Sequence, residues 1–170
     1  MSESILFPLF LSLKVSIIAT SIIAIFGTAI TYLLAKRQFL GKNIVDALVT
    51  LPLVLPPTVT GYYLMVLLGR NGWIGKYLYA WTGWTIMFTW QAAVIASVVV
   101  AMPLMVKTTK SAIESIDPDL EKAAYTLGKS ELETALQVTL PMAWTGIIAG
   151  IILSFARAIC EFGAILLSFA

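Results

Sequence analysis

Four long apolar stretches constrain this 170-residue chain more than any other feature of its sequence. A bilayer core about 30 Å thick is crossed by roughly 20 apolar residues in a helix. Uncharged runs of that length cover residues 15–35, 47–69 and 77–106, and a fourth run after Pro141 is interrupted by Arg157 and Glu161. We therefore expect four membrane-spanning helices, at about residues 10–35, 46–69, 84–106 and 142–163.

The composition also indicates a protein surrounded by membrane lipid. Residues of the hydrophobic set make up 59% of the chain, the mean hydropathy is +0.93, and only 12% of residues are charged. Soluble domains carry about 25% charged residues, so this chain has too few charges to cover a water-exposed surface. The sequence predicts an all-α fold, a multi-pass transmembrane helical bundle in a single domain surrounded by membrane lipid.

Several classes of chemistry lack the residues they need. The chain contains no histidine and one cysteine, Cys160, which rules out a His-based triad, a His-ligated metal site and a disulfide within the chain. The formal charge of +2 is too small for a nucleic-acid-binding surface. We therefore expect no catalytic residue, no metal and no cofactor bound by the chain itself.

Basic residues predict the orientation in the membrane. Seven basic side chains fall after the first and third expected spans, and three fall on the other side. The seven are Lys36, Arg37, Lys42, Lys107, Lys110, Lys122 and Lys129, and the three are Lys14, Arg70 and Lys76. Because cytoplasmic loops carry the excess of Lys and Arg, the N-terminus is expected outside the cell and the segment 107–141 in the cytoplasm.

The segment 107–141 is the only long polar stretch, and it contains helix start and stop signals. Asp117 and Pro118 predict the start of a first helix, Gly128 predicts its end in a left-handed conformation, and Ser130 with Glu133 predicts a capping box. One apolar face of the first helix is formed by Leu120, Ala123, Ala124 and Leu127. This face either docks on a partner or packs on the chain's own spans, and the residues alone leave both possibilities open.

The second span contains three prolines, which remove backbone donors and predict a kinked or opened helix. Two threonine hydroxyls follow directly. In lipid such a helix is tolerated where protein or a water-filled path satisfies the backbone. The group is either one wall of a translocation pathway or a kink needed for packing, and its members are Pro52, Pro56, Pro57, Thr58 and Thr60.

Arg157 and Glu161 stand four residues apart in the fourth span, within reach of each other on a helix. An unpaired charge at the membrane centre costs at least about 2.5–3.5 kcal/mol, so pairing is favourable there. Arg157 either attracts a passing anion while Glu161 limits how tightly it is held, or the two form a structural tie or a subunit contact.

Part of the cytoplasmic segment resembles a known family motif. Glu121, Lys122, Ala123 and Ala124, then Gly128, then Leu140 and Pro141 are similar to the "EAA" loop of the permeases of bacterial ABC importers. Lys122 stands where glutamate is most common, and Glu121 fits a variant with the acid one residue earlier. The resemblance implies a coupling helix that docks on a cytoplasmic ABC ATPase subunit, which would use the ATP.

Three further stretches resemble molybdate permeases, and share much of their pattern with sulfate/thiosulfate permeases. They are residues 51–62, 68–75 and 154–164. The resemblance implies the type I ABC importer permease fold in the cell's inner membrane, a permease homodimer, and an extracellular or periplasmic oxyanion-binding protein that delivers molybdate or tungstate. Members of the family have a further helix after the Glu-Phe-Gly segment, so the chain, which ends at Ala170, is expected to be short at this end.

Three alternatives remain open from the sequence. The first is a sulfate/thiosulfate permease, since these permeases share the pattern. The second is a truncated paralogue that docks partners without transporting. The third is an ion-coupled transporter that works without ATP. The last alternative needs an acid near the bilayer centre, for which Glu161 is the candidate.

Overall fold

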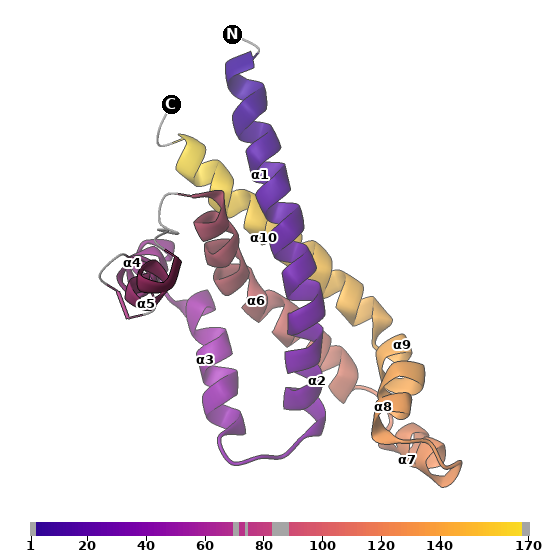
Figure 1. Cartoon of the computed structure of the whole chain (residues 1–170). Coiled ribbons are helices and arrows are strands. Elements are labelled where there is room, and N and C mark those ends of the chain that lie inside the picture. The colour runs from indigo at the N-terminus through magenta and orange to yellow at the C-terminus, as the bar shows by residue number, and fades with distance from the viewer. Residues whose placement is uncertain (1–2, 70–71, 74, 83–88, 168–170) are drawn as a thin grey trace.

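The chain is built from helices in a computed structural model that describes the backbone of residues 3–69, 72–73, 75–82 and 89–167 (Figure 1). Within these ranges every regular element is a helix, which confirms the predicted all-α class. In the described part of the chain, two helices, Leu9–Lys36 and Trp90–Glu114, are long and apolar enough to cross a membrane. Two bent helix pairs raise that number to four if each pair forms one span.

Residues 3–36 form one long, continuous helical rod (Figure 1). Its parts are α1 (Glu3–Ile22), a single wider π-helical turn η1 (Ile23–Gly27) and α2 (Thr28–Lys36). The rod ends where Arg37 adopts an extended conformation. Of the basic residues predicted to follow the first span, Lys36 is the last residue of the helix and Arg37 directly follows it.

The second predicted span is broken rather than straight. Helix α3 (Lys42–Val54) ends before Pro56, α4 (Pro57–Leu68) begins after it, and the two axes are bent by 119°. Pro56 has no N–H to continue the helix, so this break confirms the predicted kink. Pro52 lies inside α3 without ending it. The short helix α5 (Gly75–Thr82) follows.

Helix α6 (Trp90–Glu114) is the centre of the bundle. It packs most extensively against α10 (Trp144–Leu167) and also against α1, α2 and α3. At the middle of the bundle Ala101 and Met105 of α6 are fully buried against Ile23 of the rod. The third span was predicted to begin near residue 84, and residues 83–88 lie outside the part of the chain that the structure describes.

Small residues bring α10 close to α6. A Cβ added at Gly146 would collide with the side chain of Ala112, and one at Gly150 would lie 2.7 Å from the sulfur of Met105. The hydroxyl of Ser154, fully buried on α10, donates to the carbonyl of Ala101 at 3.3 Å. This close approach is typical of helix pairs in membranes.

Between α6 and α10 the chain forms a polar unit of short helical elements. They are α7 (Pro118–Thr126), α8 (Glu131–Thr134), the π-helical turn η2 (Ala135–Thr139) and α9 (Leu140–Met142). The axis bends by 71° between this unit and α10. Figure 1 shows the unit in orange at the end of the bundle opposite the two termini, so it carries the predicted coupling residues away from them.

Candidate functional site

Helix α7 has both of its predicted ends. The carboxylate of Asp117 accepts the backbone N–H of Asp119 at 3.0 Å, and Pro118 occupies the first turn. At the other end Gly128 has φ +80°, and the N–H of Lys129 reaches back to the carbonyl of Ala124 at 3.2 Å. This is the Schellman arrangement that favours glycine, because a Cβ is strained at positive φ.

The predicted capping box at the start of α8 is also present. The N–H of Ser130 donates to the carboxylate of Glu133 at 2.7 Å, and the N–H of Glu133 donates back to the Ser130 hydroxyl at 3.3 Å. The hydrogen bonds from the backbone and the hydroxyl of Ser130 lower the pKa of the Glu133 carboxyl below its usual range. The turn between α7 and α8 is therefore fixed by local hydrogen bonds at both sides.

Glu121 ties this polar unit to the end of the N-terminal rod. Its Oε1 atom lies 2.9 Å from Nζ of Lys36 and accepts the hydroxyl of Thr139 at 2.6 Å. The side chains of Lys36 and Glu121 are only 21% and 13% exposed, and Thr139 is fully buried. Because Thr139 directly precedes Leu140 and Pro141, this contact joins the two halves of the predicted motif.

Lys122, the neighbouring motif residue, has a different environment. It pairs with Asp119 within the same helix at 2.7 Å, and both side chains are more than 70% exposed. An exposed pair of this kind contributes about 0–1 kcal/mol. Glu121, rather than Lys122, therefore occupies the interior position of the motif. This agrees with the variant of the motif in which the acid stands one residue earlier than usual.

A second contact joins the same two parts of the molecule. The guanidinium of Arg37 lies 2.6 Å from the carboxylate of Glu131 at the start of α8, with the two side chains 60% and 43% exposed. Sequence analysis used Lys36 and Arg37 only for orientation and missed both contacts. Their partners are 85 or more positions away, so no local spacing signal could have found them.

The predicted apolar face of α7 is only partly buried against the chain itself. Ala124 is buried against the chain itself, with 5% exposure. Leu120 and Leu127 are 43% and 79% exposed, and Ala123 is exposed as well. Ala124 therefore packs inward, and the other three residues leave an apolar surface, here called the α7 face, on the outside of the unit.

The predicted pathway residues come from two places, the segment around the break between α3 and α4 and helix α10. Thr60 is buried and donates its hydroxyl to the carbonyl of Pro56 at 3.4 Å, whereas Thr58 is exposed. Arg157 is half-buried on α10. The side chains of Pro57 and Glu161 lie outside the described residues, so the Arg157–Glu161 pair stays a prediction.

These elements define a helical membrane protein that carries a polar, ion-paired helical unit on one end of its bundle. Residues 27–170 match the family model described as a binding-protein-dependent transport system inner membrane component. The chain belongs to this family of transport permeases.

Three relatives show how close the similarity is. The chain is 49% identical over 135 residues to the molybdenum transport system permease protein ModB of Haemophilus influenzae, covering 79% of this chain and 59% of that one. It is 47% identical over 154 residues to ModB of Escherichia coli K12, covering 91% and 67%. It is 35% identical over 155 residues to the sulfate transport system permease protein CysW of Synechococcus elongatus, covering 91% and 54%. The chain thus spans a little over half to two thirds of the length of these relatives.

The contact at Glu121 leads to a stability prediction. Glu121→Gln removes the negative charge that both Lys36 and Thr139 contact at a largely buried position. The substitution should lower the free energy of local unfolding of the α7–η2 segment by about 1–3 kcal/mol. Hydrogen–deuterium exchange of the amides in residues 118–139 measures this. Lys122→Gln is the control, since it removes an exposed pair and should change the exchange little. Equal protection in Glu121→Gln and the unchanged chain would contradict the assignment.

Proposed function

We propose that this chain is the membrane-spanning subunit of an ATP-driven importer of the ABC type, with molybdate or tungstate as its cargo. The observation that carries the proposal is the α7 face, an exposed apolar surface on a helix that is itself tied to a membrane helix through Glu121. The cargo is inferred from the relatives, because identity to the two molybdenum permeases is 47–49% and to the sulfate permease 35%.

The α7 face would dock on a cytoplasmic ATPase subunit. Leu120, Ala123 and Leu127 offer an apolar strip one helix long, and Ala123 allows a close approach of the partner backbone. ATP would be bound and hydrolysed on that partner, with no cofactor on this chain. Movement of the docked helix would pass through Glu121 to Lys36 and through Glu131 to Arg37, and so to the end of the rod.

The transport path would be formed by two copies of the chain around one axis. The break at Pro56 frees backbone groups and places Thr58 and Thr60 beside it, which is suited to the passage of a hydrated anion. Arg157 on α10 would add one positive charge. The N-terminus would lie outside the cell, where a binding protein delivers the cargo, and tight binding would belong to that protein.

Docking can be tested on the α7 face directly. Leu127→Asp places a charge at the C-terminal end of the proposed contact and should reduce recovery of the ATPase subunit with the chain by about tenfold or more, because an unpaired charge is costly in an interface. Copurification from membranes measures this. Leu132→Asp on α8 is the matched control, since Leu132 is 75% exposed and Leu127 is 79% exposed. An equal loss in both variants, or no loss in either, would contradict docking at this face.

Transport of the cargo is tested by accumulation of labelled molybdate in cells without their own high-affinity uptake system. The cells carry this chain together with the ATPase and binding-protein subunits encoded beside it. We expect accumulation that excess sulfate does not reduce and that excess tungstate does. Accumulation that sulfate abolishes would instead assign the chain to sulfate transport, and absence of accumulation with a fully assembled complex would contradict the proposed activity.

A further inference from the structure

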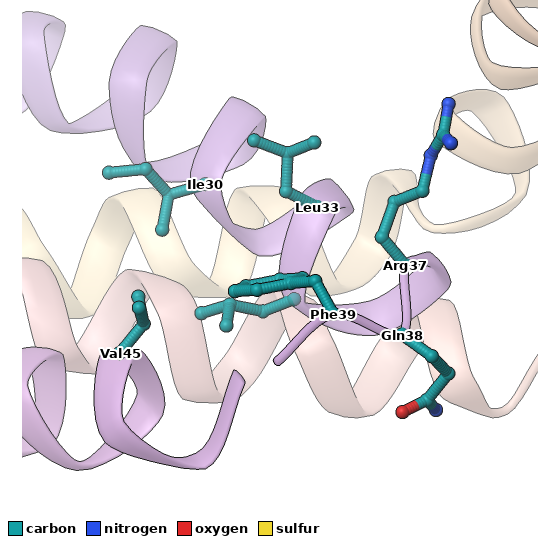
Figure 2. A pocket seen from close by; sticks show the side chains of 7 residues that line it. Ile30, Leu33, Arg37, Gln38, Phe39 and Val45 are labelled. Atoms are coloured by element: carbon teal, nitrogen blue, oxygen red, sulfur yellow. The ribbon is translucent and has the colours of Figure 1, made fainter. Parts of the chain in front are cut away.

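A groove runs between α2 and α3 at the end of the membrane helices where the basic residues gather. It encloses about 490 Å³ and is lined by Ile30, Leu33, Leu34, Arg37, Gln38, Phe39 and Val45. Figure 2 shows the apolar side chains of Ile30, Leu33 and Val45 around the ring of Phe39, with Arg37 and Gln38 at the opposite end of the group. The groove is therefore apolar toward the membrane interior and polar at its outer end.

A second, smaller pocket continues the groove at that polar end. It encloses about 330 Å³ and shares Gln38 and Phe39 with the groove. Its remaining lining residues are Gly41, Lys42, Asn43 and Ile44. The amides of Gln38 and Asn43 and the ammonium group of Lys42 can all donate hydrogen bonds. Together the two hollows form an apolar trough that leads into a recess with donor groups.

The charge around the recess is positive. No acidic side chain pairs with Lys42 among the residues that the structure describes. Asp46, one helical turn further along α3, is already shared by Lys107 at 3.3 Å and Lys110 at 3.2 Å. The carboxylate of Asp46 is thus already paired with two other lysines and does not neutralise Lys42, so the recess favours a negatively charged occupant.

The loop beside the groove also presents apolar side chains outward. Leu40 is fully exposed and Phe39 is 43% exposed, between the basic residues Arg37 and Lys42. Apolar tips flanked by basic residues are suited to the boundary between headgroups and acyl chains. A water-soluble anion would leave both the trough and these side chains uncovered.

We propose that the groove binds an anionic phospholipid. One acyl chain lies in the trough along Ile30, Leu33 and Val45, and the phosphate lies in the recess against Lys42 and the two amides. An acyl chain suits the trough because it brings no polar group that needs a partner in lipid, whereas a peptide segment would. Basic pockets between membrane helices are places where such headgroups bind.

Native mass spectrometry of the full chain tests this, with the protein released from micelles containing equal amounts of phosphatidylglycerol and phosphatidylcholine with identical acyl chains. We expect phosphatidylglycerol to be retained preferentially. Lys42→Gln should lower the ratio of the two bound lipids about fivefold, the effect of one basic residue near a charged headgroup. Lys76→Gln on α5 is the control and should leave the ratio unchanged, because Lys76 is an exposed lysine that does not line the groove or the recess.

Two further variants and one competition experiment separate the lipid from other occupants. Val45→Trp fills the trough and should reduce retention of phosphatidylglycerol at unchanged helical content, and Phe39→Ala should do the same by removing one of its walls. Millimolar inorganic phosphate should not displace the bound lipid. Equal retention of both lipids, displacement by inorganic phosphate, or a lipid-free dimer in which the second copy covers the groove would each overturn the proposal.

Discussion

The contact of Glu121 with Lys36 and Thr139 is the interaction on which the arrangement of the polar unit depends. A carboxylate taken largely out of water is stable only where its charge and its lone pairs are both satisfied. Here one oxygen receives an ammonium group from the N-terminal rod and a hydroxyl from η2. The rod, α7 and η2 thereby meet at one atom, and α7 is held with Leu120, Ala123 and Leu127 exposed.

The membrane helices supply the rigid base for this contact. Central helix α6 is approached closely by α10 at Gly146 and Gly150 and is packed by the rod around Ile23. In lipid, apolar burial gives little driving force between helices, so close packing and hydrogen bonds such as that of Ser154 to Ala101 hold the bundle together. In the proposed mechanism, a shift of α7 would therefore reach a rod that is itself packed against the bundle.

Local signals predicted much of this architecture. The cap at Asp117, the left-handed Gly128, the capping box at Ser130 and the break at Pro56 all depend on neighbouring residues, and all are present. The partners of Lys36 and Arg37 depend on how distant segments pack, and periodicity carries no information about that. For the same reason the sequence pattern placed Ala124 on one face with Leu120, Ala123 and Leu127. In the structure Ala124 is buried against the chain, whereas the other three are exposed.

A charge exchange tests most directly whether the contact between rod and polar unit carries the coupling. Uptake of labelled molybdate would be compared for Lys36→Glu, Glu121→Lys and the combination of both, each in the assembled complex. The account predicts that either single exchange abolishes uptake, since it places two like charges together in a partly buried site, and that the double exchange restores a substantial part of it. Full uptake in both single variants would show that the contact is not needed for coupling, and would contradict the account.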